Sequence, residues 1–466
     1  MDTAPFCGAV IYLTERGMEK FTALKKLIPK NQSKKIIIDF DRLSDREIGF
    51  QDLIGQLLGF LDKYEVDFNI KIKNLPCCLF PPLARDHILA SQPELLEKRV
   101  KVSDCRLCKF NSQCPGFSRA FLKSFGFPPV EPIKDLPDEI MIEVESKCNF
   151  NCYFCYNKNS FAKDGRNIQN LESDYIKKII DEIKRTDIKI VRFTGGEPLL
   201  RKDILELMKY AKSKDLEVRL NTNASLINEA LAKDLAKLVD NVLIPLEDVN
   251  CVGELSITGF PGSFSKKIKA IKLLKKYKTK IVRCGTVATR KNIKNLEKFF
   301  KLVLELNLDE WELYRPISAT KNKKLWSFND VKILIEKLIK FRKISGRTFR
   351  IANGVPFCSY DKNKVNSVSA GALSEDGHIR FVIDPRGFVK PHYYFNKNIG
   401  DPLDILACWN HPFMKKMRNL EFAPKECKNC SFLEKCRGGS RFLAKLYSGR
   451  WNAKDSLMPK SKRSSY

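Results

Sequence analysis

The middle of the 466-residue chain alternates between short apolar runs and longer amphipathic stretches. The short runs are rich in β-branched residues, which favours buried strands, and the longer stretches repeat apolar positions every three to four residues, which favours helices. Several of the helical stretches open on Ser, Asp or Asn, residues that cap helix N-termini. Strands are predicted at residues 139–145, 188–194, 217–222, 241–246, 280–289 and 310–317, and a helix follows each of them.

Six consecutive strand–helix units predict a parallel sheet, because a strand that returns through a helix pairs in the same direction as its predecessor. Short connections with right-handed crossovers would curl this sheet into part of a barrel. We therefore predict an α/β protein built on a partial (β/α)6 TIM-like barrel over residues 131–347. Active sites of such barrels lie at the carboxyl ends of the strands.

The regions on either side of the predicted barrel have different patterns. Residues 1–130 contain an apolar run, KKIIIDF, and a helical stretch, QDLIGQLLGFLDKY, which together predict a small α/β domain. Residues 348–466 contain two predicted strands, HIRFVID and GFVKPHYYF, on either side of the turn sequence Pro385-Arg386-Gly387. This pattern predicts a small, β-rich α+β extension, and three domains fit the length of the chain.

The chain contains sixteen cysteines, and most of them fall in three groups. It shows no run long enough to span a membrane, and its N-terminus, MDTAPFCGAVIYLTERG, has an early acid and too short an apolar stretch for a signal peptide. We therefore expect a cytoplasmic protein with no membrane partner. In a reducing compartment, grouped cysteines are metal ligands or reactive thiols rather than disulfides.

The formal net charge is +29, from 84 Lys and Arg against 55 Asp and Glu. Such a charge indicates an anionic partner, which could be a nucleic acid, a nucleotide or an acidic redox protein. However, the lysines are scattered over the solvent faces of predicted helices, as in SFSKKIKAIKLLKKYK, and no aromatic–basic motif for base stacking occurs. We therefore favour a biased composition over a dedicated nucleic-acid surface.

The first cysteine group directly follows the first predicted barrel strand and reads CNFNCYFCY, with thiols at Cys148, Cys152 and Cys155. A structural zinc site takes four protein ligands, whereas three thiolates can hold a cubane iron–sulfur cluster and leave one iron open. With an aromatic residue before its last cysteine, this stretch resembles the cluster loop of radical S-adenosylmethionine (SAM) enzymes. The resemblance implies that the three cysteines are catalytic and hold a [4Fe-4S] cluster, whose open iron binds the amino and carboxylate groups of SAM.

The second predicted barrel strand ends in a further motif, Gly195-Gly196-Glu197-Pro198. Glycines let the backbone approach a ligand closely, and the proline fixes the turn into the next helix. The motif is similar to the GGEP of the same family, which implies that these residues bind the methionine amino group of SAM. Alone it would be no more than an ordinary strand-to-helix turn, but its place after the cysteine loop strengthens the resemblance.

The next two predicted strands end in weaker motifs. LNTNAS resembles the family's TNG turn, which implies that Asn223 contacts the cosubstrate. In IPLED, Pro245 stands where relatives carry a serine that contacts the ribose. Glu247 is the nearest polar substitute, so we include it among the expected SAM-binding residues.

The second cysteine group, near the C-terminus, has the spacing Cys-x2-Cys-x5-Cys at Cys427, Cys430 and Cys436, followed by a Gly-Gly pair. It resembles the SPASM domain, an extension of radical SAM enzymes that carries auxiliary iron–sulfur clusters and often serves peptide or protein substrates. The resemblance implies an auxiliary [4Fe-4S] cluster on these thiols, with a zinc knuckle as the alternative.

The ligand set of this C-terminal group is incomplete. The SPASM resemblance places further cysteines where this chain has Ser440, His392 and, approximately, Met458, so we expect one auxiliary cluster here rather than two. The fourth ligand stays open between Cys408 and a ligand from outside the chain.

The third cysteine group, in the N-terminal region, repeats the Cys-x2-Cys-x5-Cys spacing at Cys105, Cys108 and Cys114. Upstream, Cys77 and Cys78 follow a predicted strand and can supply a fourth thiol. The spacing suits either iron–sulfur or zinc, and we favour iron–sulfur because the C-terminal group matches it. The remaining cysteines are expected to be buried apolar residues: Cys7, Cys251, Cys284 and Cys358.

The radical SAM resemblance implies reductive cleavage of SAM to methionine and a 5′-deoxyadenosyl radical, which abstracts hydrogen from a substrate. The implied electron donor is a ferredoxin or flavodoxin, and the SPASM likeness favours a peptide or protein substrate. Cofactor biosynthesis and tRNA modification are the alternatives within the family. A non-catalytic zinc protein that binds RNA would explain the cysteines and the charge, but not GGEP or the six alternating units.

Overall fold

The computed structural model describes most of the chain, which divides into two compact units, Met1–Asp135 and Leu136–Tyr466. The three-domain division of the sequence stays a prediction. The described residues are 10–13, 35–39, 50–64, 69–79, 88, 99–102, 105–106, 108–111, 114, 116–128, 132–156, 168–317, 326–373, 377–395 and 397–459.

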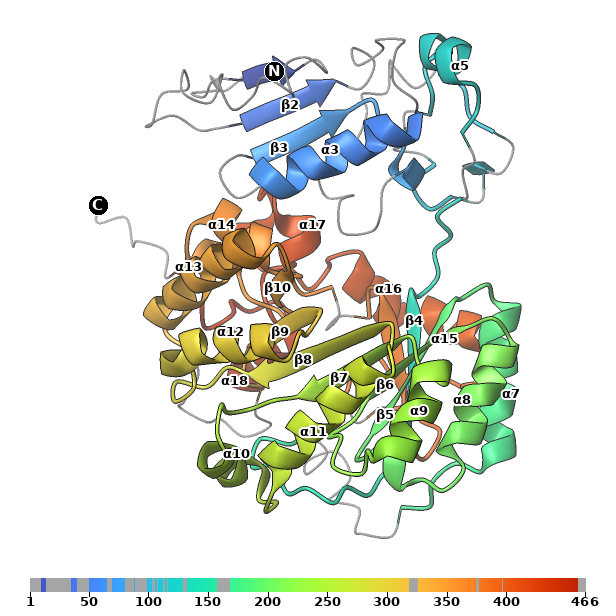
Figure 1. Cartoon of the computed structure of the whole chain (residues 1–466). Helices are drawn as coiled ribbons and strands as arrows, with labels where there is room; N and C mark the ends of the chain where they lie inside the picture. The colour runs from blue at the N-terminus through green and yellow to red at the C-terminus, as the bar shows by residue number, and fades with distance from the viewer. Residues whose placement is uncertain are drawn as a thin grey trace. The chain divides into compact units, whose positions relative to one another are not determined.

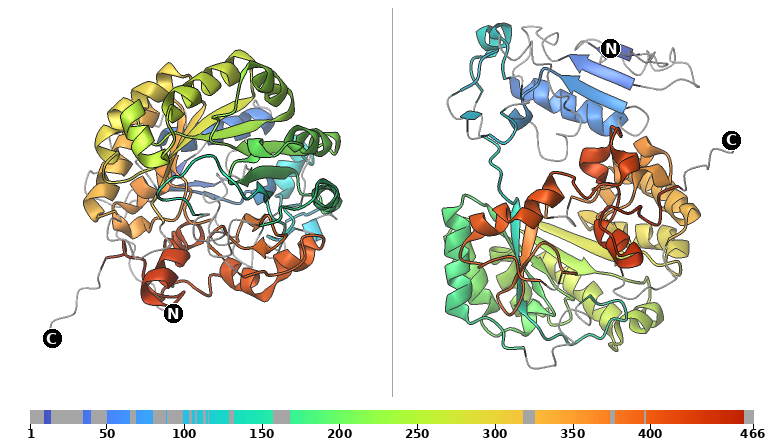
Figure 2. Two further views of the ribbon diagram at one scale, coloured as in Figure 1. Left: turned by 90° about the horizontal axis from the view of Figure 1, so that it is seen from below. Right: turned by 180° about the vertical axis from the view of Figure 1, so that it is seen from behind.

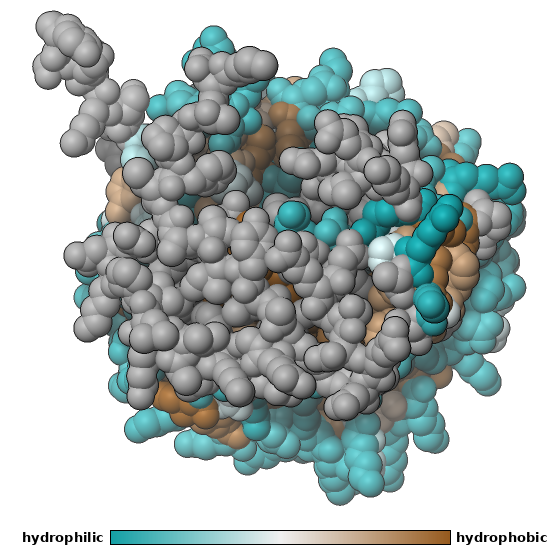
Figure 3. Space-filling model, turned by 90° about the horizontal axis from the view of Figure 1, so that it is seen from above, coloured by the Kyte–Doolittle hydropathy of each residue, from teal (hydrophilic) through white to brown (hydrophobic). Residues whose placement is uncertain are grey.

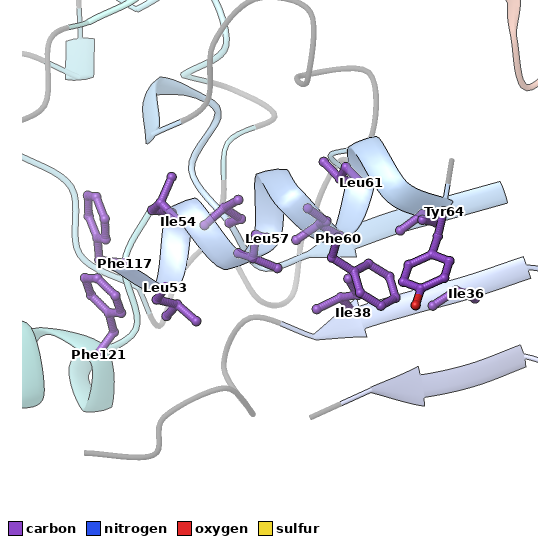
Figure 4. Packing of buried hydrophobic residues seen from close by; sticks show 13 residues of the cluster. Ile36, Ile38, Leu53, Ile54, Leu57, Phe60, Leu61, Tyr64, Phe117 and Phe121 are labelled. Atoms are coloured by element: carbon purple, nitrogen blue, oxygen red, sulfur yellow. The ribbon is translucent and has the colours of Figure 1, made fainter. Parts of the chain in front are cut away.

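The first unit is a small α/β structure, as predicted. Its parallel sheet has the order β1 (Val10–Leu13), β2 (Lys35–Asp39), β3 (Asn69–Lys73). Helix α3 (Phe50–Tyr64) lays an apolar face on this sheet, and Figure 4 shows its side chains pointing toward those of β2. The helix forms because its apolar residues recur at three- and four-residue intervals. They are Leu53, Leu57, Phe60, Leu61 and Tyr64.

The second unit is built on one nine-stranded sheet (Figure 1). Its order is β10-β9-β8-β7-β6-β5-β4-β11-β12, and all neighbours are parallel except β11 and β12. The α/β class and the mostly parallel sheet are thereby confirmed. The strands are β4 (Glu139–Glu145), β5 (Ile190–Gly195), β6 (Glu217–Asn221), β7 (Asn241–Pro245), β8 (Ile281–Val287), β9 (Glu310–Tyr314), β10 (Thr348–Ile351), β11 (Arg380–Ile383) and β12 (Val389–Lys390).

Helices follow each of the six predicted strands and lie along the outer face of the curved sheet (Figure 2). One further helix, α10 (Cys251–Thr258), lies between β7 and α11 and was not predicted, because its sequence CVGELSIT has almost no amphipathic pattern. The helices predicted are α7 (Ser173–Arg185), α8 (Ile204–Ser213), α9 (Glu229–Leu238), α11 (Ser263–Lys276), α12 (Leu296–Glu305) and α13 (Phe328–Ser345).

The inner face of the sheet carries buried charges rather than a purely apolar layer. Side chains alternate along a strand, so Ile140 of β4 belongs to the hydrophobic core while Glu139 faces the other way. The Glu139 carboxylate pairs with Arg192 (2.7 Å), Arg219 (3.3 Å) and Arg380 (2.6 Å). Burial alone would raise the pKa of Glu139, but these three guanidinium groups hold it well below its usual range. This ionic layer lies at the amino end of β4, the end opposite the cysteine loop.

The C-terminal part is mostly helical, so the expectation of a β-rich appendage was wrong. Its strands β10, β11 and β12 join the main sheet, and the strand predicted over GFVKPHYYF is confined to Val389–Lys390. Pro391 has no N–H to donate to a ladder, and the rings of His392 and Tyr394 stack on one another instead. The helices and helical turns are η9 (Phe357–Ser359), α14 (Lys362–Val368), α15 (Ile405–Asn410), α16 (Pro412–Arg418), η10 (Lys425–Cys427), α17 (Leu433–Cys436) and α18 (Arg441–Ser448).

The visible surface is mostly polar, in keeping with the many charged residues of the chain. In the face shown in Figure 3, most of the described side chains are hydrophilic, with small hydrophobic patches between them. Among the described residues, no helix combines the length and the apolar character that a membrane span needs.

Candidate active site at the carboxyl end of the sheet

The cysteine loop begins at the carboxyl end of β4, where its backbone is bound to the end of β5. The amide of Gly196 donates to the carbonyl of Glu145 (2.7 Å), and the amide of Glu197 donates to the carbonyl of Lys147 (2.8 Å). These bonds continue the pairing of β4 and β5 up to the residue before Cys148. The two motifs found in the sequence are therefore in direct contact.

Gly195 and Gly196 are needed for this contact, whatever else they bind. A Cβ on Gly195 would lie 2.4 Å from the carbonyl oxygen of Glu145, and Gly195 has φ of +136°. A Cβ on Gly196 would lie 2.2 Å from the carbonyl oxygen of Lys147. Since these are backbone atoms, a side chain would push the cysteine loop away from β5.

The far side of the loop is held by the segment around α10. The amides of Asn151 and Tyr153 donate to the carbonyls of Thr258 (2.9 Å) and Ile257 (3.2 Å), at the end of that helix. The ring of Phe150 stacks on Phe260, with centroids 4.7 Å apart. This anchoring was not predicted, because α10 itself was not.

The loop brings its three thiols together. Cys148 is exposed, Cys152 and Cys155 are partly buried, and the charge of each thiolate acts on the others. Burial, reinforced by these like charges, raises the pKa of Cys148 to about 11 and that of Cys152 to about 12. A cation that neutralises several thiolates at once would relieve both costs, and the donor set of three thiols fits an iron–sulfur cluster.

Within the described part of the chain, no three Cys, His, Asp or Glu side chains meet as closely as a single metal ion requires.

Glu197, from the GGEP motif, is fully buried and occupied by hydrogen bonds within the protein. Its carboxylate accepts from the Thr222 hydroxyl (2.6 Å), the Asn223 amide (2.7 Å) and the Leu199 amide (3.0 Å). Burial raises the pKa of Glu197 to about 6, although these donors oppose the rise. Glu197 thus ties the end of β5 to the turn after β6. Thr222 was not predicted, although it directly precedes the predicted Asn223.

Asn223 lies beside the first thiol. Its side-chain amide is 3.8 Å from Cys148 Sγ and donates to Asn149 Oδ1 (2.8 Å). Ser225 accepts a hydrogen bond from Asn149 in turn (2.8 Å). The sequence motif that suggested a cosubstrate contact is therefore next to the cysteine loop.

Glu247, at the end of β7, is buried on the side of Cys152. It accepts from the Val287 amide (2.8 Å), and its charge acts on the Cys152 thiol. Burial and the neighbouring Glu254 carboxylate raise the pKa of Glu247 to about 8, against the attraction of Lys267. The buried pair Lys267–Glu254 was not found from the sequence, because Lys267 lies in a lysine-rich predicted helix and Glu254 in a helix that was not predicted.

The C-terminal cysteine group also comes together. Cys427 and Cys436 are buried and Cys430 is partly buried, and the charges of Cys427 and Cys430 interact. Cys358, expected to be an apolar core residue, is partly buried, and its charge interacts with this group. Cys408 does not join the group, because its thiol donates to the Asp401 carbonyl (3.1 Å).

The thiols of the N-terminal group also interact with one another. Burial, reinforced by the thiolate charges of Cys114, Cys108 and Cys105, raises the pKa of Cys78 to about 12. The Gly116 amide donates to Cys114 Sγ (3.4 Å). The Cys77 side chain lies outside the described residues.

Residues 142–303 match the model of the Radical SAM superfamily. This match covers the cysteine loop, GGEP, Asn223 and Glu247. Residues 142–303 are therefore a radical SAM domain, and members of that superfamily use a [4Fe-4S] cluster and S-adenosylmethionine.

Three curated relatives show how far the likeness extends. The chain is 24% identical to PqqA peptide cyclase of Granulibacter bethesdensis over 68% of this chain and 86% of the relative. It is 25% identical to mycofactocin maturase MftC of Mycolicibacterium smegmatis over 68% and 80%. A probable GTP 3′,8-cyclase of Sulfolobus acidocaldarius is 30% identical, but over only 38% of this chain and 55% of that protein.

Solved structures agree on the fold. SuiB of Streptococcus suis bound to S-adenosylmethionine matches with a TM-score of 0.57 at 18% identity, over 70% of this chain and 78% of SuiB. The enzyme anSMEcpe with bound AdoMet and a peptide matches with a TM-score of 0.53 at 18% identity, over 68% and 92%.

Proposed function

We propose that this chain is a radical SAM enzyme that abstracts hydrogen from a peptide or protein substrate. The observation that carries the proposal is the set of three thiols, Cys148, Cys152 and Cys155, on a loop that Gly195 and Gly196 hold at the carboxyl end of the sheet. Three thiols leave one iron of a cubane without a protein ligand, which is where a cosubstrate can bind.

When bound, the cluster and SAM supply a one-electron reductive cleavage that yields methionine and transfers a substrate hydrogen to the 5′-deoxyadenosyl group. The chain's own residues hold and surround these groups. The backbone of Gly196 fixes the loop at Cys148, and Asn223 presents an amide beside that thiol. On the other side, Glu247 lies near Cys152 with its pKa raised to about 8, so it is mostly protonated near neutral pH and can donate a hydrogen bond.

Polar side chains also line the sheet directly under the loop. Lys390 of β12 and Glu143 of β4 form a buried ion pair (3.1 Å), and the hydroxyl of Tyr156 donates to the same carboxylate (3.0 Å). Burial raises the pKa of Glu143. These groups give the inside of the sheet a polar floor on which a substrate can be oriented.

A peptide substrate is favoured over a small molecule by the extent of the similarities. The alignment with PqqA peptide cyclase covers 86% of that protein, whereas the alignment with the GTP 3′,8-cyclase covers 55%. The cysteine-rich C-terminal region lies outside residues 142–303 and is the region whose sequence resembles the SPASM domain.

The electron donor that we propose is a ferredoxin or flavodoxin. Both are acidic proteins as a rule, and a net charge of +29 would speed their encounter with this chain. Reduction by such a donor should therefore slow as salt is raised, whereas reduction by dithionite should depend less on salt.

The N-terminal thiols form a further candidate metal site. The interacting charges of Cys78, Cys105, Cys108 and Cys114 support a four-thiol site, and we propose that it holds an iron–sulfur cluster. Zinc is the alternative, and it would be lost at unchanged iron if the last three were replaced by alanine.

The test of the proposed function is anaerobic incubation of the reconstituted chain with dithionite and SAM. We expect 5′-deoxyadenosine from the parent chain and none from the variant Cys148→Ala/Cys152→Ala/Cys155→Ala, which should also hold about four irons fewer. The matched control is Cys251→Ala, because Cys251 of α10 is exposed, so the expectation that it is buried was wrong. Undiminished 5′-deoxyadenosine from the triple variant would contradict the assignment.

The substrate class is tested separately. Short peptides encoded next to the gene would be incubated with the enzyme and SAM, and a mass change in one of them would support the proposal. A mass change in a nucleotide or tRNA instead would contradict it.

A further inference from the structure

We infer that Cys358 completes a four-thiol iron–sulfur site with Cys427, Cys430 and Cys436. The inference deepens the proposed function by giving the auxiliary cluster its fourth ligand, and it rests on that function only for the choice of iron as the metal. Cys358 lies 69 positions before Cys427 in the sequence, and its spacing matches no cysteine motif.

The backbone around Cys358 is bound directly to the cysteine group. The amide of Phe357, in the turn η9, donates to Cys436 Sγ (3.3 Å). The Phe357 ring packs edge-on against Phe432, which lies between Cys430 and Cys436, with centroids 5.8 Å apart. Residue 358 is therefore held beside the C-terminal group by its immediate neighbour.

The thiols themselves are within electrostatic reach of one another. The charge of Cys358 interacts with those of Cys427, Cys430 and Cys436. Cys427 and Cys436 are buried, while Cys358 and Cys430 are partly buried. Four thiols grouped in this way match the set of four cysteine ligands that a [4Fe-4S] cluster takes.

Burial raises the pKa of Cys358, Cys427 and Cys436, and neighbouring positive charges and hydrogen-bond donors oppose the rise. The positive charge of Lys362 acts on Cys358, and that of the buried Arg441 acts on Cys427. Cys436 accepts backbone hydrogen bonds from Gly438 and Gly439 in addition to Phe357. Hydrogen bonds and positive charges of this kind stabilise thiolate ligands.

The other candidates for the fourth ligand have different roles. Cys408 donates to the Asp401 carbonyl, and its charge interacts with Asp401 and Asp404 rather than with the cysteine group. Ser440 caps α18, with its hydroxyl accepting from the Leu443 amide (3.2 Å). Met458 is buried but carries a thioether, which is a much weaker ligand than a thiolate.

The experiment measures iron and the electron paramagnetic resonance spectrum of the reduced protein, in a chain whose barrel thiols Cys148, Cys152 and Cys155 are all replaced by alanine. In that chain, the N-terminal group contributes equally to every variant. Cys358→Ala should lower the iron bound at the C-terminal site by at least about twofold, as much as Cys430→Ala does. It should also change the spectrum in the same way as Cys430→Ala. Cys408→Ala is the matched control and should change neither.

Each other outcome contradicts the inference. Parent-like iron and spectrum in Cys358→Ala would exclude this ligand, and so would an effect of Cys408→Ala equal to that of Cys430→Ala. Loss of zinc at unchanged iron would exclude the iron–sulfur assignment. Cys358→Ser, which keeps the size of the side chain, separates loss of a ligand from loss of folding, and circular dichroism checks the fold of every variant. Because no variant here contains the barrel thiols, failure of this inference is distinguishable from failure of the proposed function.

Discussion

The cysteine loop of the barrel and the C-terminal cysteine group are both sets of clustered thiols, but they differ in number and exposure. The loop has three thiols, and Cys148 is exposed. The C-terminal group has three thiols in one motif and, with Cys358, four, of which Cys427 and Cys436 are buried. An open, exposed site suits a cosubstrate that must enter and leave, whereas a closed and buried site suits electron transfer or structure.

The charged residues near the thiols also differ between the two sites. The Glu197 carboxylate acts on Cys148 of the loop, whereas Lys362 and Arg441 act on thiols of the C-terminal group. A carboxylate beside the loop favours a cationic ligand, and SAM carries a sulfonium and an amino group. A positive neighbourhood stabilises the negative charge of a cluster with four thiolates. The difference indicates that the two sites have different tasks.

The largest effect is expected when the C-terminal group loses its thiols and the cysteine loop of the barrel is left intact. The variant Cys427→Ala/Cys430→Ala/Cys436→Ala should lose about four irons but still release 5′-deoxyadenosine within about tenfold of the parent rate, because SAM cleavage needs only the open cluster. Modified substrate should not form. Iron analysis and chromatography of the products measure both results. Complete loss of 5′-deoxyadenosine in this variant would show that the two sites act as one unit.

Much of the barrel could be predicted from the sequence, since each of its six central strands is a short apolar run followed by an amphipathic helix. Helix α10 was missed because its apolar residues do not follow a helical period, although Asn250 caps it by accepting from the Gly253 amide (2.9 Å). The β-rich C-terminal part was wrongly predicted. Aromatic and apolar residues there read as strands, but in the structure their rings pack against each other between helices.

The candidate site was predictable where ligands are adjacent in sequence and unpredictable where they are not. The loop thiols and GGEP follow local motifs. Cys358 and the pair Glu254–Lys267 follow none, because only the folded chain brings them to their partners. A single cysteine without a motif reads as an apolar residue until its neighbours are known.

The second prediction concerns the contact that holds the open site in place. Gly196→Ala should reduce iron in the barrel site and lower the rate of 5′-deoxyadenosine release by about tenfold to a hundredfold, because the new Cβ overlaps the Lys147 carbonyl. Gly55→Ala is the control, since it lies in helix α3 with no atom near its Cβ position. Parent-like rates and iron in Gly196→Ala would contradict the proposed role of this contact.

The third prediction concerns the closed site. Gly439 and Gly449 both have positive φ (+79° and +76°), but only a Cβ on Gly439 would overlap Pro356 Cγ, at 2.6 Å. Both substitutions to alanine should lower the free energy of unfolding by about 1 kcal/mol through backbone strain. Gly439→Ala should cost about 1–3 kcal/mol more and should lower C-terminal iron, because it displaces the segment that carries Cys358. Equal effects of the two substitutions on iron would count against the link between Pro356 and the cluster. Denaturant titration and iron analysis provide the measurements.

The last prediction concerns a pH dependence at the edge of the open site. The pKa of Glu247 is about 8 in the folded chain, whereas a glutamate in the unfolded chain has a pKa of about 4.3. The stabilisation by the neutral carboxyl is therefore complete below about pH 4 and is lost as the pH rises toward 8, by on the order of 1 kcal/mol per pH unit. Glu247→Gln stays neutral throughout, so its free energy of unfolding should rise relative to that of the parent between pH 5 and about pH 8.

This pH dependence can be measured by urea unfolding at a series of pH values, in a chain whose barrel cysteines are replaced so that metal does not alter the surroundings of Glu247. Glu229→Gln is the control. The pKa of Glu229 is lowered to about 2 by hydrogen bonds from Tyr277 and Lys276, so Glu229 is ionised in both the folded and the unfolded chain over this range. Its difference from the parent should therefore stay constant. A constant difference for Glu247→Gln as well would mean that Glu247 is ionised in the folded chain, and the edge of the open site would then carry one more negative charge near Cys152.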